Sequence, residues 1–437
     1  MRTGAPVASA TLATGPLRRW ATLLTLIIAG EMAFVLPFVI ARVFRPTLLE
    51  VFGLTNLQLG TAFSAYGVVA MAAYLLGGPL ADRYPARGLI TVALLTTALG
   101  GLGFAAMPGV KLLTVLYAFW GLTSILLFWA ALIRATRQWG GDAAQGRAFG
   151  GLDGGRGLLA AVLASALVAG FAWLTPGSPL DAGVAERSVA LQRVILICTA
   201  LTVLSAALAW GLLPADPAGG QLRGASAWNG LAQVCRRPLV WWQALIVVCA
   251  YVGYKATDYF SLYAADVLGY DAVEAAWLAT LSFWMRPLAA IGAGLVADRI
   301  EGSRTLIGGF ALMALGAGVL ATGNRLPGAT ALLAMTVIVT SVGVYAVRAL
   351  YYAIMGEARL PLSVTGAAVG LVSVLGYTPD IFAGPLFGYL LDGAPGVVGH
   401  RRMFAVIAGF AVLGMAASMV FRRLRPVVTQ QTPTTRA

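Results

Sequence analysis

The sequence predicts an all-α membrane protein with twelve transmembrane helices in two pseudo-symmetric six-helix bundles. Three observations predict this fold: the composition, a series of long apolar segments, and a motif that occurs twice. Of the 437 residues, 59% are hydrophobic and only 11% are charged, whereas a soluble domain carries about 25% charged residues. So much apolar surface can be covered only by lipid, so we expect a bilayer around this chain.

Long apolar segments lie on both sides of a more polar stretch. A spanning helix needs about 20 mostly apolar residues, and we predict six spans within residues 20–213 and six within residues 238–422. The polar stretch 214–237 is the expected linker, and 1–19 and 423–437 are the expected tails. The predicted spans are 20–42, 57–80, 89–107, 112–138, 148–174, 189–213, 239–267, 272–297, 304–323, 328–355, 364–391 and 403–421.

The basic residues predict the orientation. The net charge is +13, but the arginines separate apolar segments and do not form one basic face, so we expect lipid contact and no nucleic-acid partner. Most of the 30 Lys and Arg residues fall in segments that are cytoplasmic if the N-terminus is inside. Positive charge gathers on that side of membranes, so we expect a multi-pass protein of the cell inner membrane with both termini in the cytoplasm.

The two halves share a repeated motif. Gly78-Pro-Leu-Ala-Asp82-Arg83 follows the second predicted span, and Gly294-Leu-Val-Ala-Asp298-Arg299 follows the eighth, 216 residues later. A second pair supports the repeat: Arg134-Ala and Arg348-Ala lie late in the fourth and tenth spans, 214 residues apart. Repeated six-helix units are a common way to build secondary transporters.

The stretch from Gly78 to Arg87 closely resembles the loop motif between helices 2 and 3 of the major facilitator superfamily, with Pro85 and Ala86 as departures. The resemblance implies a twelve-helix transporter that works by alternating access. The sequence has no His, Cys or Ser constellation and no phosphate loop, so we expect neither a cofactor nor enzymatic chemistry. The resemblance also implies a gate. We expect the glycines to let helices approach and the carboxylates to face a helix N-terminus or an arginine; in the alternative, Asp82 only caps a helix and the arginines only set topology. The predicted gate residues are Gly78, Asp82, Arg83, Arg134, Gly294, Asp298 and Arg299.

Shorter segments resemble the organophosphate–phosphate antiporter branch of that superfamily. Phe38-Val-Ile-Ala-Arg42-Val-Phe is similar to the branch's helix-1 segment, in which an arginine binds substrate. Tyr254-Lys255-Ala-Thr-Asp258-Tyr259 occupies the place of its second phosphate-binding arginine, with lysine instead. Lysine contacts an oxyanion as a point charge and not through a two-pronged fork. The resemblance implies substrate contacts from Arg42 and Lys255, and the hydroxyl groups of Tyr254 and Tyr259 could add hydrogen-bond donors beside Lys255.

Ionisable residues inside the predicted spans are the remaining candidates, because each costs roughly 2.5–3.5 kcal/mol at a helix centre. Glu31 falls near the midplane, where it could carry a proton or bond a neighbouring backbone. Asp258 could pair with Lys255 at i+3. Arg286 needs a carboxylate, an anion or water, and Asp380 could relay protons or pair with a cation. Arg348 could bind substrate, form a gate with Arg134, or extend to the membrane surface.

Together these residues predict a secondary carrier for a small organic anion that could be coupled to protons, because four cations face three acids in the spans. We expect Arg42, Lys255, Arg286 and Arg348, with Tyr254 and Tyr259, to bind substrate, and Glu31, Asp258 and Asp380 to couple protons. Alternatives are a proton symporter for a neutral solute such as a sugar, and a membrane sensor on a transporter fold. We expect a monomer with a small-molecule substrate and no metal.

Overall fold

The structure is a computed structural model that describes residues 16–141, 145–175, 183–215, 233–323, 329–355, 357–358 and 362–425. These residues form helices, turns and short connections, with no strand among them. Most of the predicted linker 214–237 and of both predicted tails lies outside the described residues.

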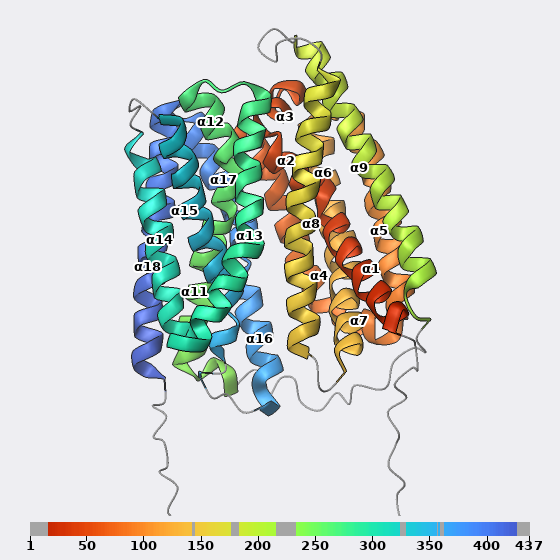
Figure 1. Ribbon diagram of the computed structural model, residues 1–437, viewed down its shortest axis with the longest axis vertical. Coiled ribbons are helices and arrows are strands. Elements are labelled where there is room, and N and C mark those ends of the chain that lie inside the picture. Colours follow the sequence, from red (N-terminus) through yellow and green to blue (C-terminus); the bar gives the residue numbers. More distant parts are fainter. Residues whose placement is uncertain are drawn as a thin grey trace, which may run out of the picture.

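The helices run side by side in two groups (Figure 1). The N-terminal half contains α1 (Pro16–Phe34), η1 (Val35–Val39), α2 (Ile40–Val43), α3 (Arg45–Phe52), α4 (Asn56–Arg83), α5 (Ala86–Ala105), α6 (Val110–Gly121), η2 (Leu122–Trp129), α7 (Ala130–Gly140), α8 (Gln145–Leu174) and α9 (Val184–Leu212). The C-terminal half contains α11 (Pro238–Ala256), η3 (Thr257–Tyr259), α12 (Phe260–Leu268), α13 (Ala272–Ile300), α14 (Gly302–Thr322), α15 (Ala329–Leu350), η4 (Ala353–Met355), α16 (Leu362–Gly376), α17 (Pro379–Asp392) and α18 (Val397–Leu424).

The predicted spans correspond to these helices, with ends that differ by a few residues. Within the described residues, eleven helical segments are long and apolar enough to cross a membrane. The predicted span 57–80 is α4, which is 28 residues long but is not one of the eleven. Its first turns carry Asn56, Gln58 and Thr61, and it packs against α6 and α17.

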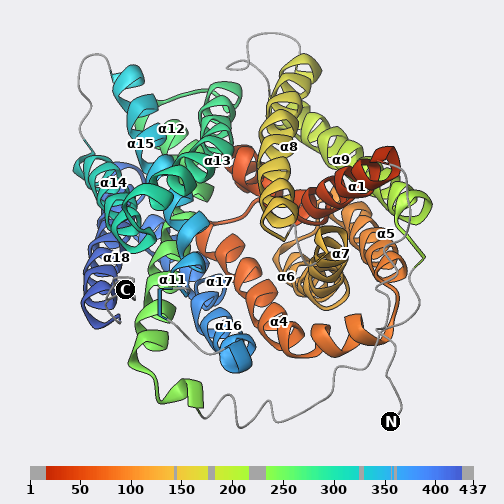
Figure 2. The same ribbon diagram turned by 60° about the horizontal axis from the view of Figure 1, so that its bottom comes forward.

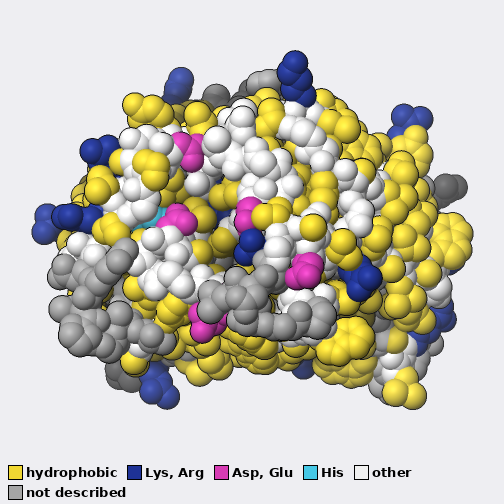
Figure 3. All heavy atoms as spheres, turned by 90° about the horizontal axis from the view of Figure 1, so that it is seen from above, with side chains coloured by type: hydrophobic (Ala, Val, Ile, Leu, Met, Phe, Trp, Pro, Cys, Tyr) yellow, Lys and Arg dark blue, Asp and Glu magenta, His cyan; other side chains and the backbone are white. Residues whose placement is uncertain are grey.

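The outer surface suits a bilayer. Large hydrophobic side chains such as Leu99, Val115 and Leu288 are exposed there, and hydrophobic side chains appear along much of the outline of the molecule in Figure 3. Figure 1 shows that α1 begins and α18 ends at the same end of the molecule, here called the terminal end. The opposite, far end is the face seen in Figure 3, where basic side chains project around the rim.

Four of the spans are interrupted near mid-length. The π-helical turn η1 follows α1 and contains Pro37, which has no N–H for a regular helical bond. The π-helical segment η2 separates α6 from α7, the 3₁₀ turn η3 separates α11 from α12, and a turn at 377–378 separates α16 from α17. Irregular backbone at membrane depth is tolerated where protein or a cavity surrounds it, so these four interruptions indicate the centre of the molecule.

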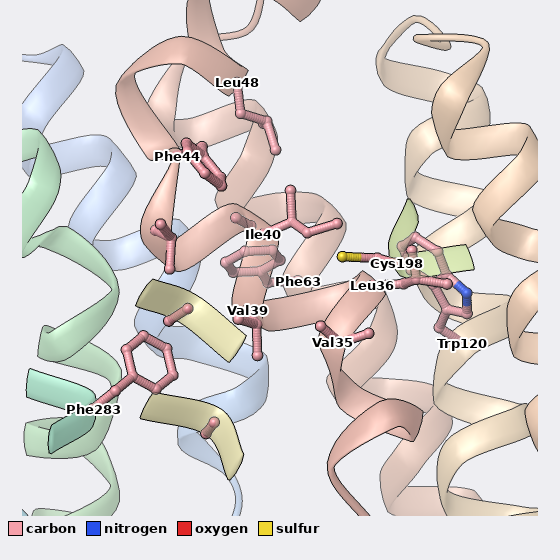
Figure 4. Close-up of a cluster of buried hydrophobic side chains, with 14 of the residues drawn as sticks. Val35, Leu36, Val39, Ile40, Phe44, Leu48, Phe63, Trp120, Cys198 and Phe283 are labelled. Atoms are coloured by element: carbon pink, nitrogen blue, oxygen red, sulfur yellow. The ribbon is translucent and has the colours of Figure 1, made fainter. Parts of the chain in front are cut away.

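The η1 segment is held from both sides. Figure 4 shows Leu36 of η1 directed toward Trp120 and Cys198 of the N-terminal half, while Phe283 of the C-terminal half lies on the opposite side. The Tyr117 hydroxyl donates to the Pro37 carbonyl at 2.8 Å, which satisfies a backbone group at the irregular turn. The packing therefore fixes the part of the chain that leads from Glu31 to Arg42.

The halves meet closest toward the far end. Helices α4 and α17 touch there without intervening side chains: a Cβ atom on Gly388 would lie 2.5 Å from the backbone of Leu57, and one on Gly67 would lie 2.6 Å from the Asp380 carbonyl. Helices α8 and α13 form the second contact, with the Trp284 indole donating to the Ser165 hydroxyl at 3.1 Å. Viewed with the terminal end turned forward, α4, α17, α13 and α8 surround the centre (Figure 2).

Candidate functional site

A central cavity lies between the two halves at the level of the helix interruptions. It has about 850 Å³ of empty space, part of it open to solvent. Half of its lining side chains are aromatic and five are basic. The lining residues are Glu31, Phe34, Phe38, Val39, Arg42, Tyr66, Tyr74, Ile125, Trp129, Arg156, Tyr251, Tyr254, Lys255, Phe283, Arg286, Arg348, Tyr377 and Asp380.

Lys255 and Asp380 form a buried pair between α11 and α17. The Lys255 ammonium lies 2.6 Å from the Asp380 carboxylate, and the Tyr251 hydroxyl donates to the same carboxylate at 3.1 Å. The ammonium also lies 4.8 Å from the centre of the Phe38 ring of the other half. In this conformation Asp380 therefore forms an ion pair with a cation, which was one of the two roles expected for it. Lys255 pairs with Asp380 and not, as the sequence had suggested, with Asp258.

Glu31 faces two arginines from different halves. Its carboxylate lies 3.6 Å from the Nε of Arg156 on α8 and 3.7 Å from an Nη of Arg286 on α13. The Arg286 guanidinium also reaches Asp153 of α8 at 3.0 Å. The orphan guanidinium seen in the sequence thus has two carboxylate partners, both in the other half. These charges join α1, α8 and α13 at the centre of the membrane region.

Arg42 pairs with Asp258 across the two halves. The Arg42 Nε lies 2.5 Å from the carboxylate, and both side chains are about 5% exposed. The two residues are 216 positions apart, which is the offset of the repeated motif. Each residue belongs to the first span of its half, so the pair joins the two halves at these spans.

Arg348 differs from the other cavity cations because no carboxylate lies within ion-pair distance of it among the described residues. Its guanidinium stacks on Tyr254 at 3.8 Å from the ring centre and approaches Tyr251 at 5.6 Å. One terminal nitrogen is buried without a hydrogen-bond partner among the same residues. An unpaired ion in a low-dielectric site is costly, and π faces offset only part of that cost.

The charge balance of the cavity follows from these contacts. Its five cations face four carboxylates within ion-pair distance in the described chain, which leaves Arg348 as the excess positive charge. The sequence prediction counted four cations against three acids and therefore also gave an excess of one positive charge. It did not include Arg156 and Asp153, which lie near the start of the predicted span 148–174. Their i, i+3 spacing at the start of a predicted span was the available signal.

Tyr259, which was predicted to bind substrate, lies apart from the other members of that set. Its side chain does not line the central cavity; it lines a smaller hollow of about 210 Å³ beside Lys255 and Asp258. Its ring lies under the guanidinium of Arg45, 3.9 Å from ring centre to guanidinium carbon. Tyr254, the other predicted tyrosine, does line the cavity.

The predicted gate residues lie at the terminal end, away from the cavity. Gly78 and Gly294 have no atom within 4 Å of an added Cβ, so the close helix approach expected at Gly78 does not occur in this conformation. Asp298 and its neighbour Arg299 are exposed in the last turn of α13, and Arg83 is exposed at the end of α4. The side chain of Asp82 lies outside the described part of the chain.

Arg134 and Arg348, the second repeat pair, have different environments. The Arg134 guanidinium donates to the backbone carbonyls of Ala81 and Tyr84 at the end of α4. Arg348 instead lines the cavity. Equivalent positions of the repeat thus contact the gate motif in one half and the binding cavity in the other.

Comparison with known proteins gives the family. The model of the Major Facilitator Superfamily matches residues 21–378. The chain belongs to this superfamily. The chain is 26% identical to the inner membrane protein YqcE of Escherichia coli (strain K12), over 94% of this chain and 96% of that protein. It is 27% identical to the inner membrane protein YihN of the same organism, over 92% and 95%.

Solved structures of major facilitator proteins share the fold. The chain resembles the nucleoside transporter NupG, with a TM-score of 0.70 and 14% identity over 92% of this chain and 100% of that one. It also resembles a bacterial homolog of the human lysosomal transporter Spinster in an inward-facing, unoccupied conformation, with a TM-score of 0.69 and 15% identity, over 95% and 100%. The chain is therefore a multi-pass membrane transporter of the major facilitator fold.

Proposed function

We propose that this transporter moves a small organic anion across the inner membrane by alternating access, and that Arg348 binds the anionic group. The observation that carries the proposal is the half-buried Arg348 guanidinium, which has one fully buried terminal nitrogen and is the cavity cation without a carboxylate partner among the described residues. A substrate anion would supply that partner. The aromatic lining, with Tyr251 and Tyr254 beside the guanidinium, suits an organic body attached to the charge.

The halves are closed at the far end and the cavity lies on the terminal side of the closing contacts. With the termini in the cytoplasm, as the basic residues predict, this is an inward-facing conformation. The cross-half pairs Arg42–Asp258 and Arg286–Glu31 must rearrange when the far end opens. The resemblance to the organophosphate–phosphate antiporter branch at Arg42 and Lys255 supports an anionic substrate.

Proton coupling fits the same geometry. Protonation of Asp380 would release Lys255, and protonation of Glu31 would release Arg156 and Arg286. Each step would free a cation for the substrate, so proton and anion would favour each other's binding, as in a symporter. In proteoliposomes, we expect uptake to follow an imposed pH gradient and Asp380→Asn to uncouple it. Gradient-independent uptake in both proteins would exclude this coupling.

The test of the anion site is equilibrium binding to the purified protein. The probes are radiolabelled lactate, gluconate and glycerol 3-phosphate, with glucose as the neutral comparison. Charge-assisted hydrogen bonds contribute about 1.5–3 kcal/mol, so Arg348→Gln should weaken binding of the recognised anion by about tenfold or more. Arg348→Lys should retain part of the affinity, because the charge survives while the planar fork is lost.

Arg134→Gln is the matched control, since Arg134 is the repeat equivalent of Arg348 and contacts the end of α4 instead of the cavity. It should leave affinity within about twofold, less than 0.5 kcal/mol. Parent affinity in Arg348→Gln, or binding of glucose in preference to all three anions, would contradict the proposal.

A further inference from the structure

A second unpaired cation lies on the far side of the cavity. Arg45, the first residue of α3, is 0% exposed. Its Nε donates to the Asn56 side chain at 3.3 Å, but both terminal nitrogens are buried without a hydrogen-bond partner among the described residues. No carboxylate there lies within ion-pair distance of it. A guanidinium in this state costs several kcal/mol relative to water, so packing alone does not explain an arginine here.

The walls around Arg45 come from both halves. Its guanidinium lies 3.9 Å from the centre of the Tyr259 ring in the C-terminal half and 6.0 Å from that of Phe63 in the N-terminal half. Both rings also line the small hollow next to Lys255 and Asp258. Arg45 therefore lies just beyond this hollow, on the line from the cavity to the far end.

The contacts that seal Arg45 are the contacts that hold the far end closed. The Asp392 carboxylate, at the end of α17, accepts hydrogen bonds from the backbone N–H groups of Asn56 and Leu57 at 3.1 and 2.7 Å. Beneath them the backbones of Gly60 and Gly384 touch. When these cross-half contacts part, the Tyr259 ring leaves with the C-terminal half and both terminal nitrogens of Arg45 become available.

We propose that Arg45 is a separate anion-binding site at the far entrance, which captures the substrate anion before it reaches Arg348. The inference rests on the proposed anion transport. In the far-side-open state the anion would be the partner that Arg45 lacks. In the closed state the Tyr259 ring takes the place of the anion beside Arg45, so the anion is free to move into the cavity. Lys255 and Arg42 lie between the two sites.

The test compares the two faces of the membrane. Uptake of the anion recognised among lactate, gluconate and glycerol 3-phosphate is measured from the far side in whole cells and from the terminal side in inside-out vesicles. Arg45→Gln should raise KM from the far side about tenfold and leave KM from the terminal side within about twofold. Arg45→Lys should recover most of the far-side loss, because it restores the charge. Arg187→Gln, which removes an exposed far-end ion pair with Glu50, is the matched control and should change neither KM.

The outcomes separate this proposal from the one on which it rests. The capture site would be overturned if Arg45→Gln changed KM equally from both faces or left the far-side KM unchanged. It would also be overturned if Arg45→Lys raised the far-side KM as much as Arg45→Gln. If Arg348→Gln abolishes binding while Arg45→Gln behaves as the parent, only the capture site fails. If no anion of the three binds the parent protein, the proposed function and this inference fail together.

Discussion

The glycines near the two ends of α4 differ in how closely another helix packs against them. Toward the far end, Gly60 and Gly67 lie against the backbone of α17, and no side chain would fit there. At the terminal end, Gly78 of the repeated motif has open space where its side chain would be, as does Gly294 at the equivalent place on α13. Small residues let helices approach closely. In this conformation the far-end glycines are in a close helix contact and the terminal-end glycines are not. The difference indicates that the terminal-end glycines form such a contact in a conformation in which the terminal end closes.

The largest expected effect comes from filling the glycine contact at the far end. Gly60→Val would place a side chain into the Gly384 carbonyl, and overpacking of this kind costs about 3 kcal/mol or more, enough to depopulate the closed far end about a hundredfold. We expect transport to be lost and a cysteine at Phe63 to react with a membrane-impermeant maleimide added from the far side. Gly170→Val, with open space around it, is the control; protection of the cysteine in Gly60→Val would contradict this view.

The labelling experiment is feasible in this chain because two of its three cysteines, Cys198 and Cys249, are buried. Cys235 is exposed and would be replaced by serine.

Filling the terminal-end glycine should have the reverse effect. Gly78→Val meets nothing in this conformation, so melting temperature and far-side protection of the Phe63→Cys reporter should match the parent. Transport should nevertheless fall strongly, because the terminal end could no longer close. Transport at the parent rate would show that Gly78 does not enter a helix contact in any state of the cycle.

A smaller effect is expected at the far-end hydrogen bonds of Asp392. Asp392→Asn removes a negative charge from the N-terminus of α4, where such charges contribute about 0.3–1 kcal/mol. The far end should open more often, with reporter labelling about two- to fivefold faster. Glu50→Gln removes another exposed far-end carboxylate and should leave the rate unchanged. An unchanged rate in Asp392→Asn would mean that Asp392 does not hold the far end closed.

The smallest expected effect concerns the terminal end of the C-terminal half, where Glu301 lies 2.7 Å from Arg425. A hydrogen bond from Arg425 lowers the pKa of the exposed Glu301 carboxyl from its ordinary 4.5. A lowered pKa in the folded state stabilises the fold above the unfolded value, and that contribution is lost as pH falls through the folded value. The parent melting temperature should therefore decline more steeply than that of Glu301→Gln below about pH 4.5. Parallel declines would contradict this role.

The fold could be predicted because it depends on the combined hydrophobicity of many residues and not on any single contact. Twenty apolar residues in a row indicate a span whatever their order, and the repeat of Gly78–Arg83 at Gly294–Arg299 divides the spans into halves. The short helix α3 was not predicted, because its eight residues are too few for a span and begin with Arg45-Pro46-Thr47. The helix interruptions at η1, η2 and η3 were equally hidden, since they depend on packing between helices.

The site could be predicted only in part. Depth in a span identified Glu31, Arg286 and Asp380 as buried charges, because that cost is local to each residue. Partners were harder. Spacing along one helix suggested Lys255 with Asp258, whereas the structure joins each to a residue on another helix. Which charges meet depends on how the helices cross, and neither periodicity nor composition carries that information.

The excess charge of the cavity has an electrical consequence. In the proposed carrier, the empty cavity bears one net positive charge, and a proton and a monovalent anion bound together leave that charge unchanged. A potential of 100 mV is worth about 2.3 kcal/mol for one charge moved across the whole membrane. A voltage that is negative inside would therefore draw both the empty carrier and the loaded carrier toward the inward-facing form. The excess charge at Arg348 makes the return of the empty protein a voltage-dependent step, so that the cell's own membrane potential would set the resting orientation of the carrier.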